Sequence, residues 1–421
     1  MPRYLDLFAG AGGLSEGFLR AGYTPVAHVE MDEAACYTLK TRVAATWLRN
    51  HGRENEYNAY LNGQYTRPEF YALIPEDELT SVLQLEISEQ TIPEIFHRVD
   101  QRLNGHPLDL IVGGPPCQAY SIAGRARSKT KMVGDKRNYL YLLYAQFLEH
   151  YHPRYFVFEN VTGLLSAKDT DGTLHFEKMR ELFHQHGYST NFRILNARDF
   201  GVLQNRKRVI LVGKLNGEPN YYPTLTPVHT ACHVEEIFAD LPPLHAGEGT
   251  PLPTPTLHYD GHYLYDADIK RYDLQPVTLH YARPNTEQDL EIYRLAVQQW
   301  NVEHKRLSYN DLPDPLKSQK NRNSFLDRFK VVAADLPVSQ TVVAHICKDG
   351  HYYIHPDISQ NRSLTPREAA RLQTFPDDYY FECVRGGSSR TSAYKQIGNA
   401  VPVRLAFCIA QAILGEGGFD D

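Results

Sequence analysis

The chain has 421 residues, 42% of them hydrophobic and 22% charged, a composition typical of a globular protein that is long enough for two domains. Its net charge of −6 excludes a uniformly basic nucleic-acid-binding protein but leaves room for a local basic patch. The six cysteines are dispersed without a CxxC pair, so we expect neither a disulfide framework nor a zinc ribbon. We expect no membrane-spanning segment and no secretory signal, which favours a cytoplasmic protein.

Apolar strands and helices alternate in the first half of the chain. We expect strands at residues 4–8, 109–112, 155–158 and 209–212, with helices at 139–150 and 176–186 between them. Alternation of this kind predicts an α/β fold with a mostly parallel sheet covered by helices. Ligands of such sheets bind at the carboxyl ends of the strands, so the turns that follow the strands are candidate sites.

The remainder of the chain has a different character. Residues 43–85 indicate a polar, helical insertion that leaves the sheet and carries no evident chemistry. From about 215 to 360, prolines and tyrosines cluster and the strand–helix alternation fades, which predicts a second, less regular domain. Within it, residues 305–330 hold seven Lys or Arg against three Asp. A further helix is expected to begin at Thr365, where Thr-Pro is a typical helix start.

A glycine-rich turn, Asp6-Leu-Phe-Ala-Gly-Ala-Gly-Gly, follows the first strand. Position 15 is serine where a dinucleotide fingerprint has its third glycine, which disfavours NAD and FAD. Gly10 and Gly12 would still let the backbone approach a nucleoside cofactor closely. Glu30, eighteen residues after Gly12, can accept hydrogen bonds from both hydroxyls of a ribose. The alternative is a turn that only packs a strand against a helix.

A second turn, Gly-Gly-Pro-Pro-Cys-Gln-Ala-Tyr-Ser at residues 113–121, follows the second strand. Two prolines fix the backbone before Cys117, and a thiol held rigidly at a strand end suits a nucleophile better than the alternative, a buried small hydrophobe. The loop 121–138 holds six basic residues and one acid. A charge run is often only a solvated surface, but directly after a candidate nucleophile it suggests a polyanionic substrate.

Two more motifs complete a candidate site. Glu159 and Asn160 end an apolar strand, where the carboxylate can cap a helix or supply a proton to a bound base. Arg206 and Arg208 lie two residues apart in Gln-Asn-Arg-Lys-Arg, on one face of an extended segment. They can be surface residues or, with Cys117 and Glu159, a clamp for an anion and a heterocycle.

Taken in order, these motifs resemble those of DNA (cytosine-5)-methyltransferases of the bacterial type. The matching segments are residues 6–15, Glu30, 113–121, 159–161, 204–208, 362–376 and 396–402. Any one of them could arise by chance, but the ordered set extends over nearly the whole chain and is highly specific.

The resemblance implies a mechanism that fits the chemistry of these residues. The target cytosine would be flipped out of the duplex, and the loop 121–138 would close over it. Cys117 would add to carbon 6, while Glu159 protonates or hydrogen-bonds ring nitrogen 3. Arg206 and Arg208 would hold the base oxygen and a neighbouring phosphate. Carbon 5 would then take the methyl group of S-adenosylmethionine, which leaves S-adenosylhomocysteine.

The resemblance also assigns binding residues. For the cofactor these are Phe8, Gly10, Gly12, Glu30, Met31, Glu86, Ile87, Pro115, Leu140, Asn399 and Val401. For DNA they are Gln118, Ser121, Arg125 and Arg127. Glu86-Ile87 departs from the Asp-Ile that is usual in the family, although glutamate can accept the same hydrogen bond from adenine. No metal is expected, because the histidine pairs 258/262 and 184/186 have no further ligands at a suitable spacing.

The family pattern implies how the chain is divided. A Rossmann-like catalytic and cofactor-binding domain would comprise residues 1–214, completed by 391–421. A smaller, irregular α+β target recognition domain would comprise 215–360, with 361–390 as a connecting segment. Ser-Gln-Thr-Val-Val-Ala-His at 339–345 resembles a short family motif near the recognition loops, although it also fits a plain strand. The tyrosines of the expected target recognition domain and the basic cluster 305–330 fit a surface that faces DNA.

The expected partner is double-stranded DNA, in a bacterial cytoplasm and in a restriction-modification system with a cognate endonuclease. A monomer is expected, because one flipped base needs one pocket. Three alternatives stay open. A tRNA cytosine-5 methyltransferase would have a shorter second domain, and a non-catalytic DNA-binding regulator would be expected to lack Cys117 or Glu159. A Rossmann oxidoreductase is disfavoured by Ser15.

Overall fold

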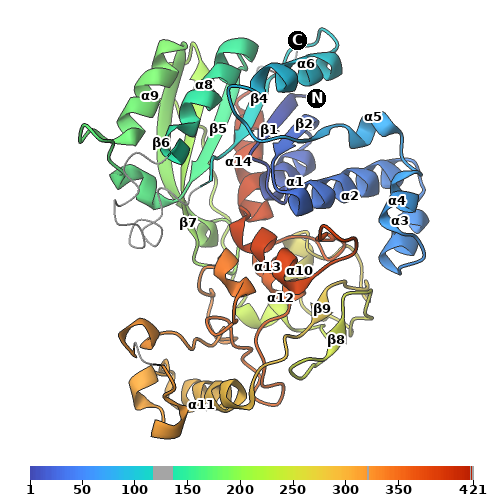
Figure 1. Cartoon of the computed structure of the whole chain (residues 1–421), viewed down its shortest axis with the longest axis vertical. Coiled ribbons are helices and arrows are strands. Elements are labelled where there is room, and N and C mark those ends of the chain that lie inside the picture. Colours follow the sequence, from blue (N-terminus) through green and yellow to red (C-terminus); the bar gives the residue numbers. More distant parts are fainter. Residues whose placement is uncertain (117–135, 320–321, 418, 420–421) are drawn as a thin grey trace.

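The computed structural model describes residues 1–116, 136–319, 322–417 and 419. The chain forms two lobes (Figure 1). The upper lobe is built on a seven-stranded sheet, and the lower lobe consists mostly of loops with the long helix α11 (Glu287–Glu303) at its far end. The predicted nucleophile Cys117 and the basic loop that follows it, up to residue 135, lie outside the described residues.

The sheet has the strand order β3-β2-β1-β4-β5-β7-β6. Its strands are β1 (Arg3–Leu7), β2 (Thr24–Glu30), β3 (Val82–Gln84), β4 (Leu110–Gly113), β5 (Tyr155–Asn160), β6 (Tyr188–Asn196) and β7 (Lys207–Leu215). The strands from β3 to β5 are parallel, whereas β7 is antiparallel to both of its neighbours. The predicted α/β fold with a mostly parallel sheet is confirmed, and β1, β4, β5 and β7 match the predicted strands.

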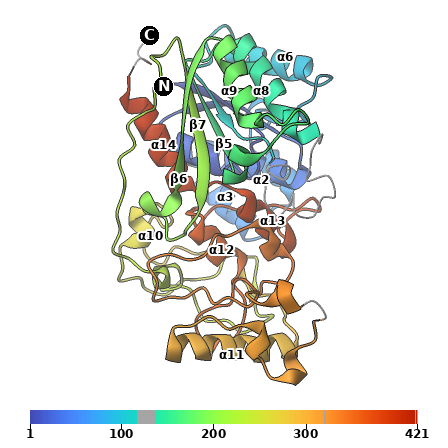
Figure 2. The same ribbon diagram turned by 90° about the vertical axis from the view of Figure 1, so that its left-hand side faces the viewer.

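Helices cover both faces of this sheet (Figure 2). On one face, α6 (Ile92–Leu103), α8 (Leu140–Tyr151) and α9 (His175–Gln185) share a core with the sheet, and on the other α1 (Gly13–Arg20) and α14 (Val403–Gly415) do so. Successive strand residues therefore enter different cores. Phe156 joins the first core and Val157 the second, so strands buried on both faces have continuous apolar sequences.

The contact between α1 and α14 joins the two ends of the chain. A Cβ atom on Gly13 would lie 2.3 Å from the carbonyl oxygen of Val401, and one on Gly17 would lie 2.5 Å from the Cβ atom of Ala406. The two helices can approach this closely only because α1 presents glycine at these positions. The sheet face that α1 begins to cover is completed by the last helix of the chain.

The predicted insertion is helical, but it does not leave the sheet entirely. It comprises the end of α2 (Glu33–Asn50), then α3 (Glu54–Leu61), α4 (Arg67–Tyr71) and α5 (Glu76–Leu79), and it ends in the edge strand β3. The expectation that residues 43–85 leave the sheet is therefore corrected at β3, which pairs with β2. The α3–α4 helices dock on a late segment of the chain, where Tyr60 donates to the buried Glu382 and Arg67 donates to the carbonyl oxygen of Cys383 at 2.7 Å.

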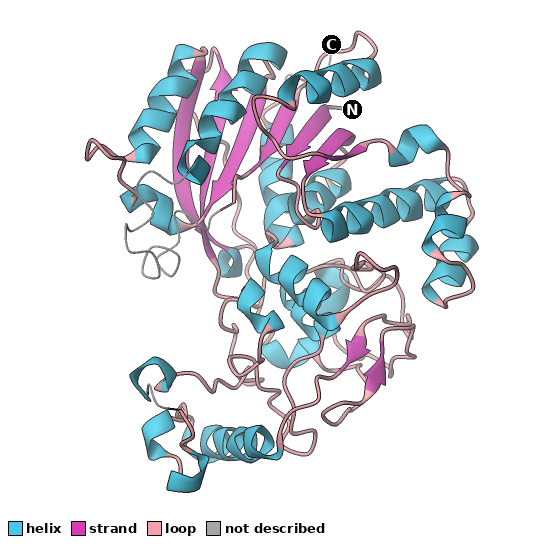
Figure 3. Cartoon of the chain, viewed as in Figure 1, coloured by secondary structure: helices cyan, strands magenta, loops and turns pink. Residues whose placement is uncertain are grey.

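The lower lobe contains little regular structure besides α11 (Figure 3). Its small sheet pairs β8 (Gly249–Thr250) with β9 (His280–Tyr281), and α10 (Tyr263–Asp266) is a single turn. Between the lobes lie α12 (Pro366–Leu372) and α13 (Arg390–Asn399). The short 3-10 helices are η1 (Lys136–Tyr139), η2 (Thr162–Ser166), η3 (Ala197–Asp199), η4 (Val234–Ile237), η5 (Tyr309–Asp311), η6 (Asp314–Leu316), η7 (Arg322–Phe325) and η8 (Ala344–Cys347).

The segment expected to connect the two domains lies at the centre of a shared core. Every residue from 362 to 382 is buried, and its apolar side chains pack with residues of α2, α3, α4, α10 and α13. Most charged side chains in this run are paired with an opposite charge, whereas Arg367 donates to Thr278 and to the carbonyl oxygens of Pro376 and Tyr379. Arg371 binds both Asp377 and Asp240, at 2.7 and 2.6 Å, and Arg362 binds Glu368 at 2.7 Å. The segment therefore holds the lobes together, while the proposed domain boundaries stay a prediction.

One stretch of the described chain, Arg390–Gly415, has the length and hydropathy of a membrane span. It consists of α13 and α14, which are separate helices on either side of residues 400–402, and 56% of its most apolar part is buried inside the protein. Because α14 packs against α1 and the sheet, its apolar character is explained by core packing.

The glycine contact between α1 and α14 can be tested by substitution. Gly17→Ala should lower the free energy of unfolding by about 1–3 kcal/mol, because the added methyl group has no room against α14. The measurement is a urea unfolding curve. Gly415→Ala, at the open end of α14 where an added Cβ meets no atom within 4 Å, is the matched control and should leave stability unchanged or raise it by about 0.4–1 kcal/mol. Equal effects of the two substitutions would contradict the close approach.

The docking of the α3–α4 helices should depend on pH through Glu382. Burial raises the pKa of this carboxyl to about 7 from its ordinary value of 4.5, although Tyr60, Thr41 and Arg67 all face it. Between these values the folded protein holds a proton that the unfolded chain releases, so stability falls as the pH rises through the window.

Glu382→Gln should remove this loss of stability at high pH, because the glutamine side chain does not titrate. At pH 8 the variant should be more stable than the wild-type protein by about 1–3 kcal/mol, since one pKa unit corresponds to about 1.4 kcal/mol, and at pH 4.5 the two should be alike. Denaturation midpoints measured across this range test the prediction. Glu149→Gln, an exposed site on α8, should follow the wild-type curve. A difference between Glu382→Gln and wild type that does not vary with pH would refute it.

Candidate functional site

The predicted motifs meet at one edge of the sheet. The strand register aligns Leu7 with Val29 and with Gly113, and Gly113 with Phe158. The glycine turn, Glu30, the Gly-Gly-Pro-Pro turn and Glu159 consequently leave the sheet at the carboxyl ends of adjacent parallel strands. The lower lobe lies beyond this edge (Figure 1).

The glycine turn and Glu30 form a cradle at the ends of β1 and β2. The Glu30 carboxylate accepts hydrogen bonds from the backbone N–H groups of Gly10 at 2.7 Å, Met31 at 2.8 Å and Asp32 at 2.7 Å. Burial raises the pKa of this carboxyl, and the three backbone bonds oppose that effect. Gly10 has φ +55°, and a Cβ atom on it would meet no atom within 4 Å. The backbone at Gly10 is thus open to close approach by another molecule.

Gly12 has a different function. A Cβ atom there would lie 2.8 Å from both Leu39 and the hydroxyl of Tyr379, so the absence of a side chain allows packing. The packing alternative considered for the glycine turn therefore applies to Gly12, whereas Gly10 borders open space. The expectation that Gly12 contacts the cofactor stays a prediction.

Ser15, which departs from the dinucleotide pattern, belongs to a buried polar cluster beneath the turn. Its hydroxyl lies 2.5 Å from that of Tyr4 and 3.3 Å from Nδ1 of His28. Asp6 lies 3.7 Å from the same histidine nitrogen, and burial raises the pKa of its carboxyl. Serine at this position therefore supports the turn from inside the protein.

The Gly-Gly-Pro-Pro turn is held between two strands. A Cβ atom on Gly113 would lie 1.9 Å from the carbonyl oxygen of Leu7, and one on Gly114 would lie 2.0 Å from that of Glu159. These glycines permit close contacts between the turn and the neighbouring strands. The side chain of Asn160 donates to the carbonyl oxygen of Pro115 at 3.1 Å. The turn that leads to Cys117 is therefore fixed up to its last described residue, Pro116.

Glu159 and Arg208 form an ion pair at this edge. Arg208 Nε lies 2.7 Å from Oε1 of Glu159, and their side chains are 12% and 16% exposed. The register explains the contact. Strands β5 and β7 are antiparallel neighbours, and Glu159 lies opposite Ile210. Arg208 is two residues before Ile210, so its side chain lies on the same face of the sheet as that of Glu159. A partly buried pair with a directed guanidinium presents a positioned carboxylate to a ligand at the strand ends.

Arg206 does not lie where a clamp on a substrate requires it. Its side chain is completely buried and donates to the carbonyl oxygens of Val342 at 2.6 Å, Ala400 at 2.7 Å and Gly398 at 3.3 Å. The expectation that it holds a base oxygen or a phosphate is corrected: its guanidinium holds three chain segments together. The alternation of side chains along an extended segment places Arg206 and Arg208 on one face. It does not reveal which other segments cover each of the two side chains.

The other expected cofactor residues surround the same edge at varying exposure. Ile87 and Val401 are buried, and Pro115 is buried in its turn. Phe8 and Leu140 are half-buried, and Met31, Glu86 and Asn399 are exposed. The backbone N–H of Leu85 donates to the carbonyl oxygen of Glu30 at 3.0 Å, which brings the Glu86-Ile87 segment beside the ribose candidate. Their roles in binding stay predictions.

Lys395 is a residue that the motifs did not indicate. It pairs with Asp32 at 2.7 Å, and it lies one helical turn before Asn399 on α13. The ion pair brings α13 to the end of β2, next to Glu30. A long-range pair of this kind leaves no signal in a single sequence.

Gln118, Ser121, Arg125 and Arg127, which are expected to contact DNA, lie outside the described residues. In the basic cluster 305–330, much of the charge is neutralised nearby. Arg328 pairs with Asp349, Lys330 with Asp327 at 2.5 Å, and Lys317 with Asp314 at 3.1 Å. Arg306 and Arg322 are exposed. The described part of this cluster is therefore less basic than its composition suggests.

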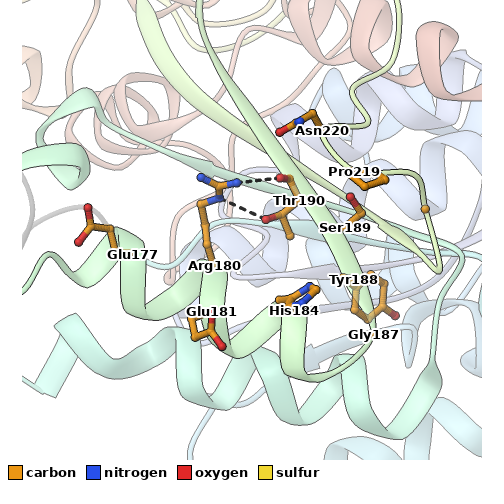
Figure 4. A pocket seen from close by; sticks show the side chains of 11 residues that line it. Glu177, Arg180, Glu181, His184, Gly187, Tyr188, Ser189, Thr190, Pro219 and Asn220 are labelled. Atoms are coloured by element: carbon orange, nitrogen blue, oxygen red, sulfur yellow. Dashed lines mark hydrogen bonds between the residues drawn. The ribbon is translucent and has the colours of Figure 1, made fainter.

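A surface cavity of about 550 Å³ lies away from this edge, between α9 and the start of β6 (Figure 4). Arg180, which lines it, donates to the Thr190 hydroxyl at 3.2 Å and to the Thr190 carbonyl oxygen at 3.0 Å. Tyr188 is level with Leu215, next to the amino end of β5. The cavity is thus at the opposite edge from the predicted site. Among the described residues, no group of three or more His, Cys, Asp or Glu is suited to a metal ion.

The fold and the glycine–glutamate cradle are those expected of a Rossmann-like enzyme with a nucleoside cofactor. A profile of the C-5 cytosine-specific DNA methylase family matches residues 3–58 and 76–415, and the chain therefore belongs to this family. The prediction of an S-adenosylmethionine-dependent DNA (cytosine-5)-methyltransferase is thereby confirmed. Residues 59–75, which the profile omits, include α4 and the end of α3.

Similar proteins extend over almost the whole chain. The type II methyltransferase M.Bpa9945I of Bacillus paralicheniformis is 39% identical, over 97% of this chain and 98% of its own length. The type II methyltransferase M.DdeI of Desulfomicrobium norvegicum is 30% identical, over 97% and 88%. A solved DNA modification methyltransferase encoded within an E. coli prophage has the same fold, with a TM-score of 0.61 over 99% of both chains at 20% identity.

The cradle predicts that Glu30 is needed for cofactor affinity. Glu30→Gln should weaken the binding of S-adenosylhomocysteine about 10- to 100-fold, because hydrogen bonds to a charged acceptor are replaced by weaker ones and an amide N–H₂ meets backbone donors. Isothermal titration calorimetry measures the affinity. Glu94→Gln, on the surface of α6, is the matched control and should bind as wild type does. Unchanged affinity in Glu30→Gln would exclude Glu30 from the cofactor site.

Proposed function

We propose that this methyltransferase flips one cytosine out of duplex DNA and methylates carbon 5 through a covalent bond between Cys117 and carbon 6. The observation that carries the proposal is the Glu159–Arg208 pair at 2.7 Å, beside the turn that leads to Cys117. The carboxylate is then held at the edge of the sheet where a flipped base would enter.

Each residue would have a defined task. The Cys117 thiolate adds to carbon 6 and makes carbon 5 electron-rich. Glu159, after it has taken up a proton from solvent, donates that proton or a hydrogen bond to ring nitrogen 3, and Arg208 orients Glu159 and neutralises negative charge nearby. After methyl transfer, loss of the proton on carbon 5 allows the bond between Cys117 and carbon 6 to break. The fixed Gly-Gly-Pro-Pro turn limits the motion of the nucleophile.

The residues at the ends of β1 and β2 fit S-adenosylmethionine. Glu30 presents a carboxylate beside the turn, and the open space at Gly10 allows close approach of a nucleoside to the backbone. When bound, S-adenosylmethionine supplies an electrophilic methyl group. Glu30 would bind the ribose, and Asn399 and Val401 would close the pocket from the second half of the chain.

The substrate would be double-stranded DNA with a short recognition sequence read by the lower lobe. The relatives are named type II methyltransferases, which supports a role in a restriction-modification system with a cognate endonuclease. We propose that the enzyme works as a monomer in the bacterial cytoplasm, because one flipped base requires one active site. The loop 121–138, with Gln118, Ser121, Arg125 and Arg127 in or beside it, would contact the DNA around that base.

The test combines purified protein, tritium-labelled S-adenosylmethionine and unmethylated genomic DNA, followed by sequencing of the methylated positions. Label on carbon 5 of cytosine within one recurring sequence is expected. Cys117→Ser should lower transfer by at least about 1,000-fold while DNA is still bound, because the variant lacks the thiolate that adds to carbon 6. Cys408→Ser, a half-buried thiol on α14, should keep wild-type activity.

Two outcomes would contradict the proposal. Normal turnover by Cys117→Ser would exclude the covalent mechanism. Label on tRNA and none on DNA would move the substrate to the tRNA branch considered above.

A further inference from the structure

Three completely buried polar side chains, Gln204, Arg206 and Gln373, form a cluster between the two lobes, which we call the Gln–Arg cluster. Gln204 Nε2 donates to Oε1 of Gln373 at 3.0 Å and to the carbonyl oxygen of Leu372 at 2.8 Å. The cluster joins the start of β7 to the end of α12. Hydrogen bonds that water cannot replace hold such segments in one arrangement.

The first side of the cluster binds the lower-lobe segment 339–343. The backbone N–H of Val342 donates to Oε1 of Gln204 at 2.8 Å, and Arg206 Nη1 donates to the carbonyl oxygen of Val342 at 2.6 Å. The backbones of Asn205 and Leu203 also bond to Ser339 on both sides, at 2.9 Å each. The next residue, Val343, has 41% of its surface exposed, so this segment reaches the surface beside the catalytic edge.

The second side binds the segment 397–400, which leads to the predicted cofactor pocket. Arg206 Nη2 donates to the carbonyl oxygen of Ala400 at 2.7 Å, and Gln373 Nε2 donates to those of Ile397 at 2.8 Å and Ala400 at 3.1 Å. These carbonyls flank Asn399 and precede Val401, which contacts Gly13 at the glycine turn. Gly398 also packs against the lower-lobe segment, since a Cβ atom there would lie 2.2 Å from the backbone nitrogen of Ala344.

A third connection runs along β7. Arg208 lies in β7 two residues after Arg206, which immediately precedes this strand, and Arg208 pairs with Glu159. A shift of Arg206 therefore moves the strand that positions the proposed proton donor. The Gln–Arg cluster thus lies at the junction of the lower lobe, the cofactor pocket and the catalytic carboxylate.

We infer that Arg206 and Gln373 are positioning residues that couple DNA binding against segment 339–343 to cofactor binding beside residues 398–401. The inference rests on the proposed function. DNA bound at the edge would contact segment 339–343 at the exposed Val343, and the shared hydrogen bonds would hold Ala400 and Val401 in the conformation that closes on the cofactor. By linkage, the cofactor raises the affinity for DNA by the same factor.

The experiment measures the affinity of S-adenosylhomocysteine for the full-length protein by isothermal titration calorimetry, alone and with a duplex that carries the mapped target sequence. We expect DNA to tighten binding in the wild-type protein by about 10-fold or more, within the usual range of coupling. The ratio of the affinities for S-adenosylhomocysteine with and without DNA should fall below about 3-fold in two variants. Arg206→Lys keeps the charge but cannot reach three carbonyls, and Gln373→Met removes the amide.

Two further variants make the result decisive. Thr341→Val removes only a bond at 2.5 Å from the Thr341 hydroxyl to the carbonyl oxygen of Asn205, so it tests the lower-lobe side even if the buried variants do not fold. It should lower the ratio as well. Arg98→Lys, on the surface of α6, is the matched control and should keep the wild-type ratio.

The outcomes separate coupling from simple structural support. Variants that bind S-adenosylhomocysteine more weakly with and without DNA, at an unchanged ratio, would overturn the inference, and so would a wild-type ratio near one. Methylation by the wild-type protein is checked first. Its absence would overturn the proposed function, whereas methylation with unchanged ratios in the variants would overturn the coupling alone.

Discussion

The buried ion pairs of residues 362–382 are the constraint on which both lobes depend. Arg371 lies between Asp240 of the lower lobe and Asp377, and Lys270 binds the same Asp240 at 2.5 Å. All four side chains are completely or almost completely buried. Charges removed from water are tolerated only with well-placed partners, so loss of one leaves another unpaired at high cost. The lobes consequently meet in one orientation. Helix α12 connects these ion pairs to Gln373 and to the edge of the sheet.

The site is assembled from segments that are far apart in the sequence. The glycine turn and Glu30 come from the first thirty residues, the Glu159–Arg208 pair from two antiparallel strands, and Asn399 and Val401 from the end of the chain. Each of these segments is short and adjoins a strand or a helix. The chemistry is therefore located on rigid elements, and the backbone hydrogen bonds around Glu30 and Pro115 limit the freedom of the groups that would meet the reactants.

Local signals in the sequence predict a part of this arrangement. Strands β4 and β5 are recognisable because burial on both faces gives them apolar runs, and β1 is recognisable although it contains the buried Asp6, because a glycine-rich turn marks its end. Strand β3 has three residues, and β6 is an edge strand rich in polar residues, so neither has a clear pattern. The long helix α11 lies within a region whose prolines and tyrosines suggest irregular structure. The burial of Arg206 depends on segments 136 or more positions away, which no local pattern indicates.

The glycine contact between α1 and α14 also determines when the protein can become active during its synthesis. The sheet face bearing Tyr4, Leu110 and Val157 is complete only after α14 has left the ribosome, because α14 packs on this face. Until then a nascent chain exposes this apolar face, even with every strand present. A nascent chain that still lacks α14 therefore carries all the proposed catalytic residues but lacks a closed core, so methylation is expected only after α14 has packed against α1.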